Sequence, residues 1–237
     1  MKKLIALLLA LSMVLCLAAC GDKNPDEPNA ENNTPSSPVQ DDKPEDNVKD
    51  EAPSGGSVQK QLEKADPSAE EDFLVIDYGD GMVELREYLG DDEIVVIPDT
   101  VEGLAITHIG DYAFTNNETI KGIRLSDSVT NIGEGSFAFC TSLEVVLCGS
   151  GLTTVGTSAF MACKQMHTIE LNEGLISLGS MAFSDCDSLT TLEIPDSVTD
   201  VQAMLCSGSE DAITIVAAAG SAAEAYANEA GVAFKAK

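Results

Sequence analysis

The chain has 237 residues and a formal net charge of −27 at pH 7, with 40 acidic against 13 basic side chains. A nucleic-acid binder needs Lys and Arg clustered against phosphates, so this charge argues against nucleic acid as a partner and against attraction to an anionic lipid surface. With no Trp and only four Tyr, the sequence also offers few aromatic anchors for an interface or a sugar-stacking platform.

Residues 1–19 have the pattern of a signal peptide: Lys2 and Lys3 give a basic start, and an apolar run over 4–17 is too short to span a bilayer comfortably. The Leu-Ala-Ala-Cys string that ends at Cys20 resembles the lipobox of bacterial lipoproteins. This resemblance implies cleavage before Cys20, diacylglycerol on its thiol, and a lipid-anchored protein on the extracytoplasmic side of a bacterial cell membrane. An ordinary secretory signal that happens to contain Cys20 is the alternative.

Residues 20–71 are dominated by Asp, Glu, Asn, Pro, Ser and Lys, with almost no large apolar side chain. Such a segment cannot bury enough surface to offset the entropy of ordering it, so we predict a disordered acidic, Pro-rich linker that starts at the lipid anchor. Residues 58–64 could form a short helical turn, which Pro67 limits, and we assign it no function.

Residues 73–78 and 82–88 alternate apolar and polar side chains on either side of Gly79-Asp80-Gly81, which predicts a β-hairpin. A third strand is predicted over 93–97. Together these segments form an expected N-terminal cap over 72–98.

A 23-residue repeat follows, from about residue 99 to 217. An apolar-Gly dipeptide opens each unit, a Phe follows at a fixed offset, and an alternating segment lies further on, as a coil with one β-strand per turn requires. The dipeptides are Ile109-Gly110, Ile132-Gly133, Val155-Gly156 and Leu178-Gly179, and the phenylalanines are Phe114, Phe137, Phe160 and Phe183. We expect the rings to form a buried column, and the glycines to allow a positive φ or close approach between coils.

The pattern Ile-Gly-x-x-Ala-Phe-x-x-Cys-x-x-Leu-x-x-Ile-x-Ile-Pro-x-Ser-Val-Thr, best seen over residues 178–199, resembles the BspA-like leucine-rich repeats of bacterial surface proteins. The resemblance extends from about Phe73 to the end. It implies a leucine-rich-repeat solenoid of the α/β-horseshoe type, with mostly short parallel strands and few helices, that binds or adheres to a protein or glycan. A fifth unit has Gln202, Cys206 and Ser209 at the Gly, Phe and Cys positions, so we expect it to be distorted.

The C-terminal cap is predicted over 218–237. Ser221 and Glu224 form a capping box that opens a short helix through Glu229, and Gly231 stops it before a strand over 232–234.

The outward positions of the repeated strands are the candidate ligand face. Two neighbouring columns contribute to it, in which Val145 and Leu147 are unusual outward apolar residues and could form a contact patch; ordinary strand surface is the alternative. The face consists of Arg124, Val145, Leu147, Thr168, Glu170, Thr191 and Glu193.

Two alternatives to a binding module stay open. Glu170 and Glu193 lie on adjacent turns, a spacing at which paired carboxylates can hydrolyse glycosides, but the sequence shows no bounded pocket, so we do not expect an enzyme. The other alternative is a passive structural or spacer module without a specific ligand.

We expect no metal or cofactor. His108 and His167 fall in different coils without a Cys or carboxylate at ligand spacing. Cys140, Cys163 and Cys186 share one repeat position, where their side chains point the same way, so we expect buried thiols that fill the core.

Overall fold

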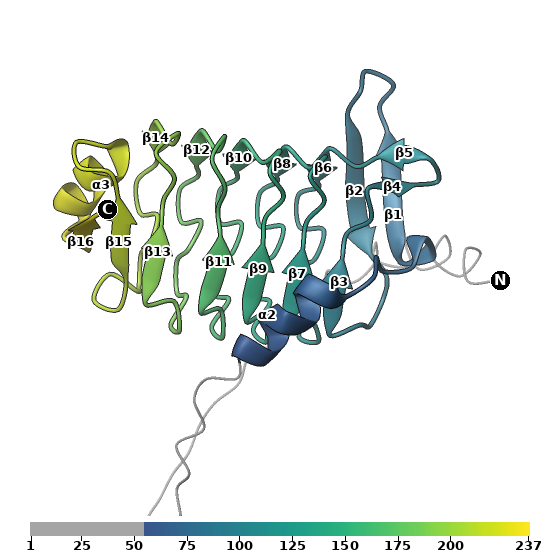
Figure 1. Ribbon diagram of the computed structural model, residues 1–237, viewed down its shortest axis with the longest axis horizontal. Helices are drawn as coiled ribbons and strands as arrows, with labels where there is room; N and C mark the ends of the chain where they lie inside the picture. Colours follow the sequence, from purple (N-terminus) through teal and green to yellow (C-terminus); the bar gives the residue numbers. More distant parts are fainter. Residues whose placement is uncertain (1–54) are drawn as a thin grey trace, which may run out of the picture. The chain divides into compact units, whose positions relative to one another are not determined.

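The computed structural model describes residues 55–237, which lie within one compact unit of the chain, Asp50–Lys237. The chain winds as a β-solenoid whose successive turns lie side by side (Figure 1), as the 23-residue period predicts. The expected signal peptide, Cys20 and the first part of the linker lie outside the described residues.

Each turn carries two short strands instead of the one that the repeat pattern predicts, and the first set, of two-residue parallel strands, builds one side of the solenoid. Thr154 pairs with both Asn131 and Ser177, so the register advances by one repeat at every strand. These strands are β6 (His108–Ile109), β8 (Asn131–Ile132), β10 (Thr154–Val155), β12 (Ser177–Leu178) and β14 (Asp200–Val201).

A second side carries the longer strands that the alternating segments predict (Figure 1). A four-stranded parallel sheet has the order β11-β9-β7-β3, and β13 begins a separate three-stranded sheet with β15 and β16. The strands are β3 (Ile94–Val96), β7 (Gly122–Arg124), β9 (Val145–Leu147), β11 (Thr168–Glu170), β13 (Thr191–Glu193), β15 (Thr214–Ala217) and β16 (Ala233–Ala236).

Tight turns close each coil on the remaining side, and they use a left-handed backbone at two positions four residues apart. At the first position φ is 59° at Tyr112, 56° at Gly135 and 53° at Ser158. The left-handed region costs an L-residue roughly 1–2 kcal/mol. Most of these turns therefore carry strain, and only the turns with glycine at the position avoid it. The non-glycine residues in this conformation are Tyr112, Ser158, Met181 and Met204 at the first position and Asn116, Phe139, Ala162 and Asp185 at the second.

The predicted phenylalanine column is confirmed. Phe137, Phe160 and Phe183 have essentially no exposed surface, and adjacent rings stack with centroids 5.2 and 5.7 Å apart and interplanar angles of 3° and 2°. Phe114 lies 4.8 Å from Phe137 and extends the column. Because each ring packs on the ring of the next turn, the rings become buried only when the turns stack.

The repeated glycines allow close approach between coils. A Cβ built on Gly179 would lie 2.5 Å from the carbonyl carbon of Gly156, and one on Gly156 would lie 2.8 Å from that of Gly133. These contacts are with backbone atoms, so a side chain at either position would push two turns apart.

The N-terminal end begins with the hairpin of β1 (Phe73–Asp77) and β2 (Val83–Tyr88), and β2 continues into the side that β6 and β8 form. Phe73 and Tyr88 add two rings to the aromatic column, 5.5 Å apart, with Tyr88 5.3 Å from Phe114. A second short antiparallel pair, β4 (Thr100–Val101) and β5 (Leu104–Ala105), follows.

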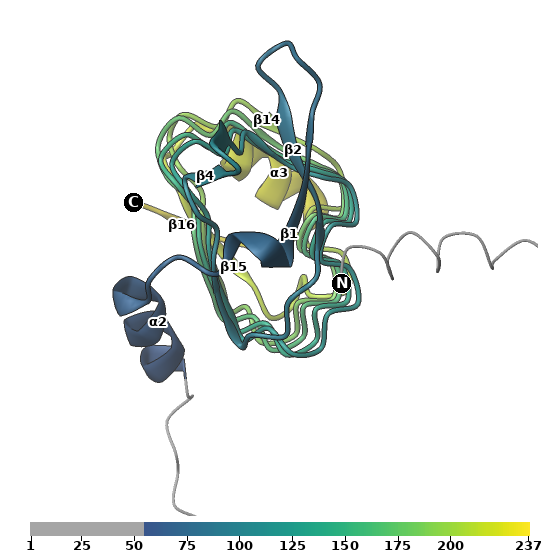
Figure 2. The same cartoon turned by 90° about the vertical axis from the view of Figure 1, so that its right-hand side faces the viewer.

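The C-terminal end carries α3 (Ala222–Ala230), which overlies the ring of coils when the solenoid is viewed end on (Figure 2). The Ser221 hydroxyl accepts a hydrogen bond from the Glu224 amide, and Gly231 ends the helix with a φ of 74°. The strand after it, β16, pairs in parallel with β15 and completes the three-stranded sheet.

The expected distortion of the fifth unit is wrong for its backbone. Its strand β14 pairs with β12 in the same register as the other turns, and Cys206 is fully buried in place of a Phe. The phenol of Tyr226 on α3 accepts a hydrogen bond from the Cys206 amide, so the C-terminal helix supports the turn where the repeat weakens.

The linker expected over 20–71 differs from the structure in its last part. Residues Gly55–Lys64 form helix α2, and Glu70–Asp72 form a 3-10 turn that leads into β1. In the end-on view α2 lies outside the ring of coils, against one side (Figure 2). Within residues 55–237 no helix is long and apolar enough to cross a membrane.

Candidate ligand face and the helix that covers part of it

The candidate ligand face is the outer surface of β7, β9, β11 and β13, and its residues fall in the columns that the repeat predicts. Arg124 pairs with Leu147 and Leu147 with Glu170, while Val145 pairs with Thr168. Thr191 and Glu193 stand in the equivalent positions of β13, beyond the break in strand pairing.

Helix α2 covers the first part of this face. Val145 is fully buried and Leu147 is 8% exposed, because Val58 and Leu62 of α2 pack on them. The cluster also contains Val96 of β3, and it is separate from the main core. The contact patch expected at Val145 and Leu147 is therefore already occupied by the chain's own helix.

Gly122 gives α2 its close approach to the sheet. A Cβ at this position would lie 2.7 Å from Cγ1 of Val58 and 2.9 Å from Cδ1 of Leu62. The equivalent residues of later turns are Val145, Thr168 and Thr191. The missing side chain of Gly122 therefore leaves a hollow between the flanking side chains of Ile94 and Val145, and the two aliphatic residues of α2 fill it.

Polar groups fix α2 from both directions. The Gln59 amide donates to the Glu170 carboxylate at 2.8 Å, and the Arg124 guanidinium donates to the Ala65 carbonyl just past the end of the helix, at 2.9 Å. A cation beside the last carbonyls and a carboxylate nearer the first turns suit the helix dipole. Ser68 then bonds to both backbone groups of Val96 and joins the segment to the sheet edge.

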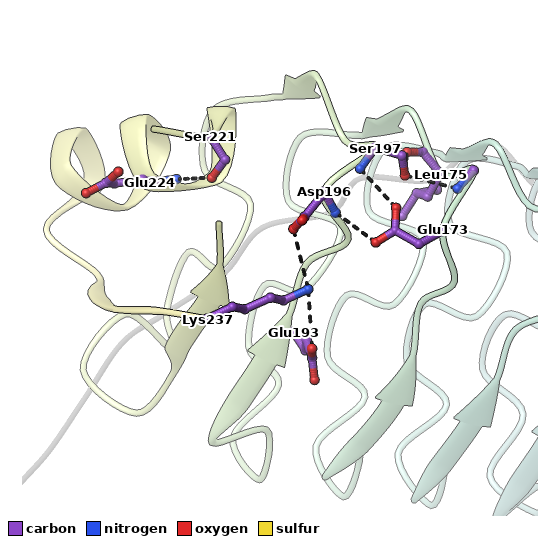
Figure 3. Close-up of polar contacts among 9 residues, drawn as sticks. Glu173, Leu175, Glu193, Asp196, Ser197, Ser221, Glu224 and Lys237 are labelled. Atoms are coloured by element: carbon purple, nitrogen blue, oxygen red, sulfur yellow. Dashed lines mark hydrogen bonds and ion pairs between the residues drawn. The ribbon is translucent and has the colours of Figure 1, made fainter. Parts of the chain in front are cut away.

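The last part of the face is largely exposed, although Gln59 of α2 reaches Glu170 at its border. Glu170, Thr191 and Glu193 are exposed and Thr168 is half-buried. Lys237 reaches across from the C-terminus, with Nζ 3.3 Å from Glu193 and 3.7 Å from Asp196 (Figure 3). This strip is a polar array on the successive strands β11 and β13.

A carboxylate beside the strip reinforces its loops. Glu173 accepts hydrogen bonds from the backbone amides of Asp196 and Ser197, at 3.1 and 3.2 Å (Figure 3). These amides, with a smaller contribution from Lys237, lower the pKa of Glu173.

Glu170 and Glu193 are not arranged as a catalytic pair in a pocket. Glu170 bonds to Gln59 and Glu193 pairs with Lys237, and both lie on an open sheet face. A hollow of about 550 Å³ lies between β14 and α3, and another of about 480 Å³ lies beside Tyr112; neither is lined by these carboxylates. The geometry gives the hydrolase hypothesis no support.

The cysteine column consists of buried free thiols, as expected. The Sγ atoms of Cys140, Cys163 and Cys186 each donate to the carbonyl of a Phe in the preceding turn, at 3.1, 3.1 and 3.2 Å. Burial raises the pKa of Cys140 and of Cys186 to about 12. In the protonated form these thiols fill the core as small apolar side chains.

The two histidines lie in different turns, and His167 Nε2 lies 3.8 Å from the Glu144 carboxylate. His108 Nδ1 lies 2.8 Å from the Thr107 hydroxyl, and His167 Nδ1 lies 2.9 Å from that of Thr168. Among residues 55–237 no group of three or more His, Cys, Asp or Glu side chains is placed to hold a metal ion.

The sequence analysis allowed a helical turn over residues 58–64, but it missed that Val58, Gln59 and Leu62 of α2 cover part of the face. The sequence of the sheet strands contained a signal for this helix. The outward columns read Thr and Glu in β11 and β13, whereas the rungs under α2 have Gly122, Val145 and Leu147. Apolar residues among outward positions that are mostly polar indicate that another segment covers them.

The fold and its outward face define a leucine-rich-repeat solenoid. The family model described as BspA type leucine rich repeat region matches residues 94–216 in six copies. The chain therefore belongs to the BspA-type leucine-rich-repeat family. Its members are typically bacterial surface proteins, and their repeats generally serve as non-enzymatic binding modules. A search of curated proteins found no match.

Two solved structures share the fold. A leucine-rich-repeat protein of T. pallidum is 24% identical, with a TM-score of 0.62, over 64% of this chain and 71% of that one. A leucine-rich-repeat protein of Bacteroides ovatus is 25% identical, with a TM-score of 0.52, over 62% of this chain and 42% of that one. The match thus spans less than half of the Bacteroides protein.

Proposed function

We propose that this chain is a binding module of the bacterial cell surface, anchored by lipid on Cys20, that recognises an extracellular protein or glycan. The family supports a protein-binding or adhesion role in general. The lipobox-like string before Cys20 supports the anchor, and the acidic composition fits a soluble, displayed domain.

The uncovered strip of the sheet face is the surface that binds. The observation that carries this proposal is the repeated Thr-x-Glu on two successive turns, with Thr168 and Glu170 on β11 followed by Thr191 and Glu193 on β13. The middle residue of each strand is buried, so the core fixes the outward side chains from behind. A rigid array loses little entropy when a ligand binds to it.

The test uses the full chain on an array of extracellular proteins and glycans. The variant Thr191→Lys with Glu193→Lys changes two exposed positions of β13, and Thr199→Lys with Asp200→Lys makes the same change of charge on the opposite side of the turn that follows. We expect capture of the ligand to fall at least about ten-fold in the first variant and to persist in the second.

Two other results would contradict the proposal. Equal capture by both double variants would move binding away from this strip. Capture of nothing on the array would favour the passive spacer module instead.

A further inference from the structure

The seat of α2 on β3, β7 and β9 holds a short helix that two apolar side chains anchor. Helix α2 spans ten residues, begins with Gly55 and Gly56, and has no acidic residue in its first turn. Helices of this length are marginal in water without tertiary contacts. Just two of its side chains, Val58 and Leu62, are buried against the sheet.

The solenoid beneath the seat does not depend on α2. The strands β7 and β9 keep their own inner core, with Ile123 and Val146 fully buried in the main cluster. The α2 cluster is distinct from that core. Departure of the helix would expose Val96, Val145 and Leu147 without opening the main core, which places α2 at the low-stability end of the structure.

We infer that the α2 seat is a helix-binding groove, from which α2 is displaced by an amphipathic helix of a partner protein. The inference deepens the proposed function and rests on it, because it names a partner class for the covered part of the same face. The hollow over Gly122 selects aliphatic side chains at positions i and i+4 of the partner, as Val58 and Leu62 are.

Charge adds a second element of selection. Glu170 accepts from the neutral amide of Gln59, the residue after Val58. A partner with Lys or Arg at that position would form a charge-assisted bond in place of the neutral one. Arg124 would bond to the last carbonyls of the partner helix, as it does to Ala65, and this fixes the direction of binding.

The experiment measures binding of a fluorescein-labelled peptide with the sequence of residues 55–68 to the full chain by fluorescence anisotropy. Leu62→Asp in the chain puts a charge into the apolar seat contact and releases the resident helix, but leaves the seat intact. In the unmodified chain α2 occupies the seat, so the apparent affinity for the peptide is reduced to the fraction of molecules whose seat is free. We therefore expect the peptide to bind Leu62→Asp roughly ten-fold or more tightly than the unmodified chain.

A matched variant blocks the seat without harming the solenoid. Adding Gly122→Thr to Leu62→Asp places a side chain where Val58 and Leu62 enter, and the solenoid already accepts Thr at this column in Thr168, Thr191 and Thr214. We expect peptide binding to be lost in this double variant. A peptide with Gln59→Arg should bind several-fold more tightly than the original, with a stronger dependence on salt.

Three results would overturn the inference. They are absence of saturable binding to Leu62→Asp, binding that Gly122→Thr leaves unchanged, and a concentration-dependent dimer of the unmodified chain that Gly122→Thr abolishes. The last result would assign the groove to α2 of a second copy. A chain that captures its array ligand through Thr191 and Glu193 but takes no peptide would overturn the helix groove alone and leave the proposed function standing.

Discussion

Phenylalanine rings carry much of the cohesion between turns of the solenoid. Phe160 lies between Phe137 and Phe183 and has no exposed surface. Phe160→Ala removes contacts with both neighbouring turns, and we expect it to lower the free energy of unfolding by about 3–5 kcal/mol, measured by denaturant titration.

Phe139 in the preceding turn provides the control, because this residue is 44% exposed. Phe139→Ala should change the free energy of unfolding by less than about 1 kcal/mol. Similar losses in the two variants would contradict the assignment of Phe160 to the core column.

The left-handed turn positions offer a change in the opposite direction. Ser158 has a φ of 53°, and the preceding turn has Gly135 at the equivalent position. Ser158→Gly removes the left-handed strain but gives the unfolded chain more freedom, so we expect a net gain of about 0.5–1 kcal/mol and a melting temperature higher by a few degrees.

Ser177→Gly in β12 is the comparison for Ser158→Gly. Its backbone is that of a strand, where glycine only costs entropy, and thermal unfolding should occur at a lower temperature. A lower melting temperature for Ser158→Gly would show that its turn is not strained.

At the scale of elements, the core beside the strands holds buried thiols, among them Cys148 directly after β9. Burial, with a smaller contribution from Glu170, raises the pKa of Cys148 to about 12, from an ordinary value of 9.0. The unfolded chain releases this proton above about pH 9 while the folded chain keeps it. Stability is therefore full below pH 9 and falls as pH rises toward 12, by about 1.4 kcal/mol per pH unit for each such thiol.

Cys148→Val tests this dependence, because Leu125, Leu171 and Ile194 occupy the equivalent positions of other turns. Urea titrations between pH 8 and 10.5 should show that the free energy of unfolding falls less steeply with pH in the variant. The difference in slope should be the contribution of one thiol. Parallel pH profiles would indicate that the thiol is accessible to solvent in the folded protein.

The sequence analysis allowed a short helical turn over residues 58–64 but gave α2 no place in the fold and no function, and the reason is physical. The helix is polar apart from Val58 and Leu62, and two apolar residues are too few for a periodicity that separates a helix from a solvated linker. Its stability comes from tertiary contacts with Val145, Leu147 and the hollow of Gly122. The longer repeat strands, in contrast, could be placed to within one residue, because every turn repeats the same apolar positions.

At the scale of the whole molecule, the fold consists of one 23-residue repeat that stacks on itself and of two terminal segments that differ from it. The period predicted the strand register and the phenylalanine column, but not the course of the fifth unit, where Tyr226 of α3 compensates for the lost Phe. The candidate face was predicted as a set of outward positions. Which of them are available to a ligand depends on α2, and that depends on a contact between segments far apart in the sequence.

Attachment to the membrane is a property of the whole protein, and it stays a prediction because Cys20 lies outside the described residues. In a bacterial host, the chain should incorporate a fatty-acid analogue and partition with membranes, because two acyl chains suffice for stable anchoring. Cys20→Ser should abolish both, with Cys16→Ser as the control that changes neither. Release of the unmodified chain into the medium without lipid would favour an ordinary secretory signal.

The account depends on a self-sufficient solenoid that carries a separable helix on its binding face, and hydrogen exchange measured by mass spectrometry tests this most directly. We expect amides of Gly55–Lys64 to exchange at least about 100-fold faster than those of Val145–Leu147, and Leu62→Asp to accelerate exchange in α2 while leaving the inner strands protected. Equal protection of α2 and β9, or loss of protection throughout β7 to β11 in Leu62→Asp, would contradict it.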